Sequence, residues 1–190
     1  MIKMIHGSKL SLRPAKECDR KKVYEWLTHS DVTPSMMGPA DYPDHPIPAW
    51  ENFCSDYLPH YFDDSAPYLG RCFIIVVGRK DIGVVSYNRI DRNKKETELD
   101  IWLCSEAYCG KGYGSDALET VCKYLHGIYG VIRFIIRPSA RNKRAIAAYK
   151  RAGFKLHPIT MERQIKGYGQ PDVKDAVVLI KEIKISHFQI

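Results

Sequence analysis

The fold is decided by one short stretch, Cys109-Gly110-Lys111-Gly112-Tyr113-Gly114. It follows a strand-like run, Glu98 to Leu103, and opens a helix-like run, Ser115 to His126. Three glycines at alternate positions leave a row of backbone N–H groups with no side chains in front of them. The helix that follows directs the positive end of its dipole to the same place. The stretch therefore predicts a loop that binds a pyrophosphate, with a plain strand-to-helix turn as the alternative.

A second motif lies about 30 residues further on and removes much of that ambiguity. The segment from Asn142 to Phe154 reads Asn-x-x-Ala-x-x-x-Tyr-x-x-x-Gly-Phe, and it follows a strand-like run, Arg133 to Arg137, closed by Pro138. In this order and spacing, Gly-Lys-Gly-x-Gly and the second motif together resemble the acetyl-CoA core of the GNAT N-acetyltransferase superfamily. The superfamily usually has Arg or Gln at the start of the loop, where this chain has Cys109. We expect binding to survive this change, because backbone donors hold the phosphates.

The resemblance implies an α/β (α+β) fold, and the sequence predicts a single domain over residues 1–190. We expect a mixed sheet of six or seven strands with helices on both faces. Its fourth strand, Glu96 to Leu103, and its fifth, Arg133 to Arg137, should splay apart, with acetyl-CoA between them. The other expected elements are a strand at Leu10–Pro14, a helix at Lys16–His29, a loop over 30–48, a helix at Ala49–Phe62, strands at Cys72–Val77 and Ile82–Ile90, a helix at Asn142–Ala152, and closing strands at Phe154–Glu162 and Ala176–Ile185 around a hairpin loop at Lys166–Lys174.

Composition narrows the class of protein. A chain of 190 residues is long enough for one sizeable core, and no apolar run approaches the length of a membrane span. The six cysteines are scattered and lack the spacing of a zinc site. We therefore expect reduced cysteines, no metal and a cytoplasmic location.

The charge is polarised along the chain. The formal net charge is +7, yet residues 31–64 hold seven carboxylates and no Lys or Arg, whereas residues 110–155 hold ten basic residues and two acids. This distribution argues against a nucleic-acid binder. It favours a phosphate-rich ligand beside the glycines and a cationic partner beside the acidic segment, from which we name Asp41, Asp44 and Glu51 as substrate-binding candidates. The alternative is that both are solvated faces.

The fourth strand offers a general base for transferring an acyl group to an amine. In the run from Glu98 to Leu103, the side chains of Glu98, Asp100 and Trp102 share one face, where the two carboxylates can couple and one pKa can rise. The alternative is an exposed polar face. The chain is most similar to aminoglycoside 6′-N-acetyltransferases, whose proposed base is an aspartate ten residues before the first glycine. This resemblance assigns the base to Asp100. We expect Glu98, on the same strand face, to contact the substrate.

The resemblance also implies the remaining site residues. Tyr149 is the candidate acid for the coenzyme A thiolate, with packing of helix on sheet as its alternative, and Asn142 either bonds the pantetheine or caps a helix. Lys143 and Arg144 are candidates for the 3′-phosphate, or are solvated. The residues expected to bind acetyl-CoA are Trp102, Leu103, Cys104, Cys109, Gly110, Lys111, Gly112, Tyr113, Gly114, Ser115 and Asn142.

These features predict an acetyl-CoA-dependent N-acetyltransferase for a cationic small molecule, with the 6′-amine of an aminoglycoside as the expected acceptor. The runs Tyr24–Leu27 and Tyr57–Pro59 resemble the N-terminal half of that family. A protein N-terminal acetyltransferase of the ribosomal-protein type is the alternative, since Leu12-Arg13-Pro14 resembles its opening. A non-catalytic acyl-CoA-binding module is a weaker hypothesis. A P-loop or Rossmann protein does not fit, because no Ser or Thr follows a Gly-Lys pair. We expect no nucleic acid or membrane partner, and a monomer or homodimer.

Overall fold

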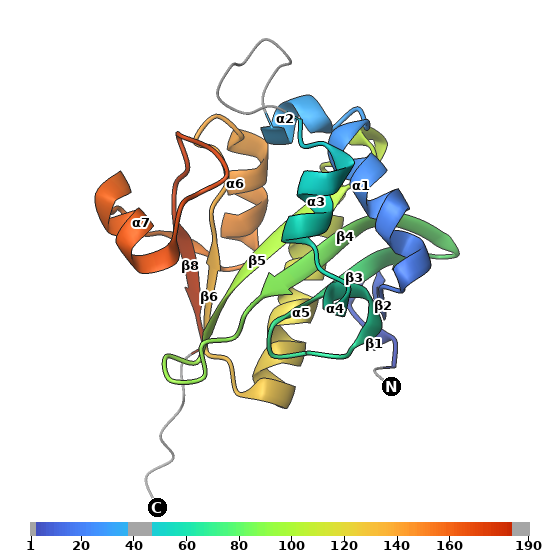
Figure 1. The fold of residues 1–190 in the computed structure, drawn as a ribbon, viewed down its shortest axis with the longest axis horizontal. Helices are drawn as coiled ribbons and strands as arrows, with labels where there is room; N and C mark the ends of the chain where they lie inside the picture. Colours follow the sequence, from blue (N-terminus) through green and yellow to red (C-terminus); the bar gives the residue numbers. More distant parts are fainter. Residues whose placement is uncertain (1–2, 38–46, 184–190) are drawn as a thin grey trace, which may run out of the picture.

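A computed structural model describes residues 3–37 and 47–183 of the chain. Within these residues, eight strands form one sheet in the order β1-β2-β3-β4-β5-β6-β8-β7 (Figure 1). The strands are β1 (Ile5–His6), β2 (Ser11–Pro14), β3 (Gly70–Val77), β4 (Lys80–Asn88), β5 (Glu96–Leu103), β6 (Arg133–Ile136), β7 (Lys155–Leu156) and β8 (Leu179–Glu182). Only β5 and β6 run parallel; the other neighbouring pairs are antiparallel. The mixed α+β class is confirmed, with eight strands where six or seven were expected.

The helices occupy both faces of this sheet. In the described part of the chain they are α1 (Arg20–Thr28), α2 (Thr33–Met37), α3 (Trp50–Asp56), α4 (His60–Asp63), α5 (Tyr113–Tyr129), α6 (Lys143–Arg151) and α7 (Met161–Tyr168), with 3-10 turns η1 (Glu17–Asp19) and η2 (Glu106–Tyr108). None of the helices that the structure describes is long and apolar enough to cross a membrane.

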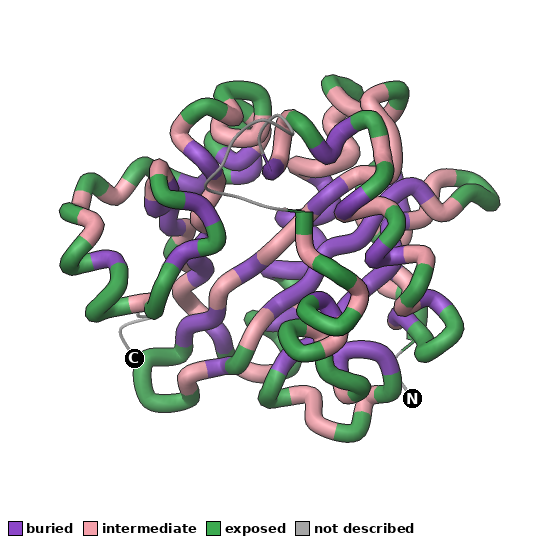
Figure 2. The backbone as a smooth tube through the Cα atoms, turned by 45° about the horizontal axis from the view of Figure 1, so that its top comes forward, coloured by how far each residue is buried: buried purple, intermediate pink, exposed green. Residues whose placement is uncertain are grey.

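Strand β3 divides the interior into two cores. Its side chains alternate, so that Cys72 and Ile74 belong to the core under α1, α3 and α4, whereas Phe73 and Ile75 belong to the core under α5 and α6. The central strands are buried along most of their length, and exposed residues gather on loops and outer helix faces (Figure 2). The sheet thus separates two layers of helices.

The prediction of one continuous helix over Ala49–Phe62 is wrong, because this segment forms two separate helices, α3 and α4. Pro59 has no N–H to donate and disfavours helical geometry at Leu58. Helix α3 accordingly ends where Tyr57 N donates a hydrogen bond to Phe53 O. Helix α4 begins in the turn where Tyr61 N donates to Leu58 O. The first predicted helix also starts later than expected, at Arg20, after the 3-10 turn η1.

Two other segments differ from expectation. Part of the loop expected over 30–48 is helical as α2, and residues 38–46 lie outside the described residues. The expected strand Phe154–Glu162 is limited to Lys155–Leu156, and α7 replaces its end and the start of the expected hairpin loop. Thr160 caps α7 by accepting a hydrogen bond from Arg163 N. Such a cap favours the start of a helix, and here it outweighs the sequence pattern that predicted a strand.

Strands β5 and β6 stay together for only three residues. Glu96, Thr97 and Glu98 pair with Arg133, Phe134 and Ile135, after which the strands diverge. The other edge of β5 remains paired with β4 up to Leu103. The expected splay of the fourth and fifth strands is therefore confirmed, and it leaves one backbone edge of β5 open from about residue 99 onward.

Gly83 on β4 fixes how closely β4 approaches this open strand. A Cβ at Gly83 would lie 2.5 Å from the backbone oxygen of Trp102 and 2.9 Å from the Cα of Leu103. We expect Gly83→Ala to lower the free energy of unfolding by about 1–3 kcal/mol, because the strands must separate to fit the methyl group. Urea unfolding measures this change.

Gly127→Ala on α5 is the matched control, because nothing lies within 4 Å of a Cβ there. It should be neutral or stabilising by up to about 1 kcal/mol, since alanine favours helix. Equal behaviour of the two variants would contradict the close approach at Gly83.

Candidate active site

Two carboxylates on β5 have different surroundings, although they share one face of the strand. Glu98 forms a bidentate ion pair with Arg137, whose Nε and Nη2 donate to its two oxygens at 2.5 and 2.9 Å. Arg137 also donates to the backbone oxygen of Gly169 at 2.9 Å, at the end of α7. Through Arg137, Glu98 thus links β5 to the end of β6 and to the end of α7, at the point where the two strands diverge.

Asp100 lies beyond this ion pair and is free of such a partner among the described residues. Its Oδ2 accepts one hydrogen bond from Asn88 Nδ2, at 3.3 Å. Burial, with the nearby negative charges of Glu98 and Asp172, raises the pKa of Asp100 to about 8, against a smaller opposing effect of Asn88 and Arg137. A carboxyl group with such a pKa is mostly protonated at neutral pH, and its deprotonated form is a better proton acceptor than an ordinary carboxylate.

Asp100 lies in the lining of a cleft of about 540 Å³, which we call the acceptor cleft. A narrower hollow of about 100 Å³, which we call the slot, adjoins it on the glycine-rich side. The two hollows share five lining residues, which are Met36, Ile101, Trp102, Asn142 and Tyr149. A ligand in the slot and a second ligand in the cleft can therefore meet beside Trp102 and Tyr149.

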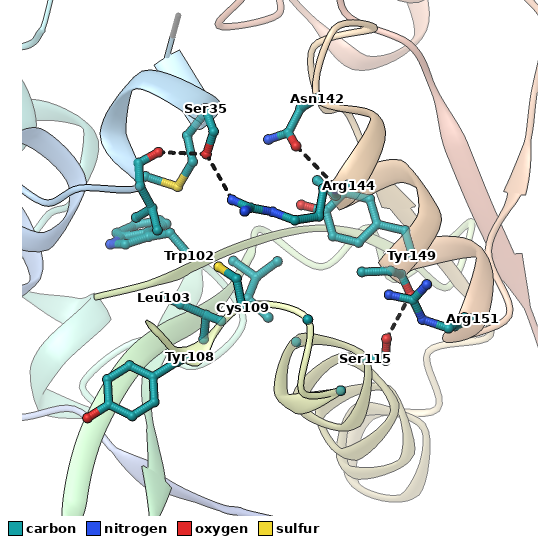
Figure 3. Close-up of a pocket in the computed structure, with 18 residues that line it drawn as sticks. Ser35, Trp102, Leu103, Tyr108, Cys109, Ser115, Asn142, Arg144, Tyr149 and Arg151 are labelled. Carbon is teal, nitrogen blue, oxygen red and sulfur yellow. Dashed lines mark hydrogen bonds between the residues drawn. The ribbon is translucent and has the colours of Figure 1, made fainter. Parts of the chain in front are cut away.

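The slot has the features that a pyrophosphate needs (Figure 3). Gly110, Gly112 and Gly114 line it at the N-terminus of α5, a helix of 17 residues whose first N–H groups have no partners within the helix. Gly112 has a φ of 86°, a conformation that side chains rarely adopt. Ser115 donates its hydroxyl to Ala148 O at 2.9 Å and so joins α5 to α6 across the slot.

The open edge of β5 forms the other side of the slot. Cys104 N donates to Ile82 O on β4, at 2.8 Å. Because backbone groups alternate along an antiparallel strand, Ile101 and Leu103 direct theirs away from β4, toward the slot. Of the three residues expected to contact acetyl-CoA on β5 and just after it, Trp102 and Leu103 line the slot, whereas Cys104 lies outside this lining.

Some of the residues predicted to bind acetyl-CoA in and beside the glycine-rich loop line the slot, and others do not. Cys109 and Ser115 line the slot together with the three glycines, whereas Lys111 and Tyr113 lie outside its lining. The Cys109 thiol is a weak nucleophile here, because burial raises its pKa.

Helix α6 supplies two residues at the junction of slot and cleft. Asn142 Oδ1 accepts from Ala145 N at 3.0 Å and caps the helix, while the residue also lines both hollows, so its two expected roles are compatible. Tyr149 is 9% exposed and also lines both hollows. Burial and the charge of Asp100 raise the pKa of Tyr149, which keeps its phenol protonated at neutral pH.

Sequence reasoning missed the residues that α2 brings to the slot. Val32, Ser35 and Met36 line it, and Ser35 accepts a hydrogen bond from Arg144 at 3.3 Å. Arg144 is also paired with Glu106, at 2.6 Å between Nη2 and Oε1. It is therefore not simply solvated. The turn-rich composition of 30–48 carries no signal for these contacts.

The acceptor cleft contains acidic residues that differ from those expected. Asp41 and Asp44 lie outside the described residues, and Glu51 is exposed on α3, outside the cleft lining. Asp56 and Asp172 line the cleft instead, together with Asp100. Burial and the charge of Asp172 raise the pKa of Asp56.

Within residues 3–37 and 47–183, no group of three or more His, Cys, Asp or Glu side chains is placed so that it could hold a metal ion.

The model of the acetyltransferase (GNAT) domain family matches residues 9–155, which is most of the chain. The protein belongs to this family of acetyltransferases, as its two motifs predict.

Relatives within the family differ in what they act on. A ribosomal-protein-serine acetyltransferase of Escherichia coli (strain K12) is 28% identical over 103 residues, which are 54% of this chain and only 57% of that protein. Among solved structures, the aminoglycoside acetyltransferase AAC(6′)-Ib in complex with paromomycin and acetyl-CoA has a TM-score of 0.69 at 20% identity, covering 92% of this chain and 94% of its own. The ribosomal L7/L12 α-N-protein acetyltransferase RimL with coenzyme A has a TM-score of 0.69 at 21% identity, covering 95% and 98%. These similarities leave the acceptor open.

We expect Gly112→Val to weaken coenzyme A binding at least tenfold. Valine strains a backbone at φ 86°, and its side chain meets Lys9, whose Nζ lies 3.0 Å from the position of a Cβ. Gly130→Val is the control, because Gly130 ends the same helix at φ 68° with open space around it. Titration calorimetry should show loss of affinity for Gly112→Val alone. Similar affinities of the two variants would show that the loop does not hold the ligand.

Proposed function

We propose that this protein transfers the acetyl group of acetyl-CoA to a primary amine of a small molecule that carries several positive charges. The 6′-amine of an aminoglycoside is the candidate acceptor. The observation that carries the proposal is the acidic cleft, which contains Asp56, Asp100 and Asp172 and joins the slot beside Tyr149.

The chemistry of the cleft favours a cation over a neutral acceptor. Three carboxylates from α3, β5 and the loop before β8 line one hollow, and the single arginine among its lining residues, Arg137, is neutralised by Glu98. Such a group of carboxylates creates a negative potential that attracts cations. Ammonium groups on the acceptor would relieve the repulsion between these carboxylates.

The transfer itself follows from the placement of Asp100 and Tyr149. In the proposed step, Asp100 takes a proton from the acceptor ammonium, and the neutral amine attacks the thioester carbonyl held at the open edge of β5. A C–N bond forms and the C–S bond breaks, while Tyr149 donates its phenolic proton to the departing thiolate. The nitrogen of the new amide then returns its second proton to the Tyr149 phenolate, and Asp100 releases its proton to solvent. Holding both substrates at the junction makes a covalent enzyme intermediate unnecessary.

The pH dependence of turnover tests the role of Asp100. Because the base works deprotonated and its pKa is raised to about 8, kcat/KM should rise with pH through a midpoint near 8. Asp100→Asn should lower kcat/KM by about 10²-fold or more and remove this midpoint. Glu98→Gln should move the midpoint to lower pH, because it removes a negative charge and leaves Arg137 unpaired. Normal turnover by Asp100→Asn would assign the base elsewhere.

A coenzyme A release assay across acceptors tests the substrate class. The panel contains aminoglycosides, linear polyamines, a monoamine and N-terminal peptides. We expect turnover on polycations, and the double variant Asp56→Asn/Asp172→Asn should raise their KM roughly 3- to 30-fold at low salt. High salt should reduce this difference, because it screens the carboxylates. The monoamine KM should change less.

Glu51→Gln/Glu162→Gln is the control for this assay, since it removes the same charge from exposed positions outside the cleft lining. Turnover confined to N-terminal peptides would instead support the second candidate, protein N-terminal acetylation, which the ribosomal-protein-serine acetyltransferase relative favours. Binding of acetyl-CoA without turnover on any acceptor would contradict both.

A further inference from the structure

The N-terminal turn between β1 and β2 is fastened to the first turn of α5. Asp116 accepts three hydrogen bonds from this turn: from Ser8 N at 3.0 Å, from Ser8 Oγ at 2.8 Å and from Lys9 N at 2.7 Å. The pKa of Asp116 is lowered, since these bonds outweigh the opposing effect of burial, so its carboxylate is ionised and directed at the turn. The segment that leads into β2 therefore has a fixed position beside the glycine-rich loop.

Gly7 makes this close approach possible. A Cβ at Gly7 would lie 2.5 Å from Thr120 Oγ1 and 2.7 Å from Asp116 Oδ2. Thr120 itself donates to the backbone oxygen of Asp116 at 2.7 Å, which fixes the surface that the turn meets. After the turn, Leu10 and Leu12 are buried in the core under α5 and anchor its other end. The turn is thus held from both sides.

Because the turn between β1 and β2 packs against α5, the side chain of Lys9 lies beside the glycine-rich loop. Its Nζ donates to Lys111 O at 3.3 Å and lies 3.0 Å from the position that a Cβ of Gly112 would occupy. Its side chain is exposed, and within residues 3–37 and 47–183 no carboxylate forms an ion pair with it. An ammonium group with no carboxylate partner among the described residues is therefore placed over the N-terminus of α5, where a pyrophosphate is expected.

We propose that Lys9 binds the pyrophosphate of coenzyme A from outside the glycine-rich loop, and that Gly7, Ser8 and Asp116 are positioning residues that hold it there. Backbone N–H groups supply hydrogen bonds to phosphate oxygens but no full charge, whereas a diphosphate carries two negative charges. The ammonium group of Lys9, on the solvent side, supplies the missing charge. The inference rests on the proposed use of acetyl-CoA and is independent of the acceptor.

Calorimetry with three probes tests the role of Lys9. The probes are coenzyme A, dephospho-coenzyme A, which lacks only the 3′-phosphate, and pantetheine, which lacks the pyrophosphate. Lys9→Gln should raise the Kd of coenzyme A and of dephospho-coenzyme A by the same factor, roughly 5- to 20-fold, with a weaker dependence on salt. Lys9→Arg should restore most of the affinity. Binding of pantetheine, or the KM of S-acetylpantetheine, should be unchanged.

Lys80→Gln is the control, because Lys80 is an exposed lysine at the start of β4 and its loss changes the net charge equally. Equal affinity of Lys9→Gln and the wild type for coenzyme A would overturn the inference. A loss seen with coenzyme A but not with dephospho-coenzyme A would also overturn it, since the 3′-phosphate would then be the partner. If the wild type does not bind coenzyme A, the proposed function fails instead.

A double-mutant cycle tests the positioning residues. Asp116→Asn should weaken coenzyme A binding in the same direction, because it loosens the turn that carries Lys9. Lys9→Gln/Asp116→Asn should be no weaker than Lys9→Gln alone, since both changes remove one interaction. Additive losses would show that Asp116 acts independently of Lys9. If Asp116→Asn does not fold, the comparison of Lys9→Gln with Lys9→Arg decides the matter.

Discussion

The early separation of β5 from β6 is the constraint on which the site depends. Three residues of each strand pair, and then the ion pair between Glu98 and Arg137 marks the place where they diverge. An open strand edge inside a sheet normally exposes unpaired backbone groups at a cost in free energy. In this protein that edge becomes one side of the slot, and helix α6 brings Asn142 and Tyr149 to the opposite side. A ligand that pairs with the strand edge would satisfy it.

Groups of opposite charge lie at the two ends of the site formed by the slot and the acceptor cleft. Backbone donors at the start of α5 and the ammonium group of Lys9 lie at one end of the slot, and the carboxylates of Asp56, Asp100 and Asp172 line the cleft at the other. The proposed phosphate-rich donor and cationic acceptor would be drawn to opposite ends and would meet at the junction. The charge of Asp172 also raises the pKa of both Asp56 and Asp100. A cationic substrate would lower both pKa values by neutralising that charge.

The sequence predicted those parts of the fold and site that local chemistry specifies. The bounds of β5 agree with the predicted strand, because alternating polar and apolar residues encode one strand face. Three alternate glycines before an amphipathic run predicted the loop and α5, and the spacing from Asn142 to Tyr149 predicted two residues that meet on one wall of the slot. Where local signals conflicted, the prediction was wrong: Pro59 interrupts the helix expected over 49–62, and the cap at Thr160 starts α7 where a strand was expected.

Contacts between distant segments could not be predicted in this way. By itself the sequence determined the family, the glycine-rich loop and the β5 carboxylates, because each depends on residues close together in the chain. Only the tertiary structure paired Glu98 with Arg137, which leaves Asp100 as the candidate base. Only it brought Asp172 opposite Asp56, and Lys9 over Gly112. The physical reason is that burial and electrostatic potential depend on distances in space, which packing across the sheet decides and spacing along the chain does not encode.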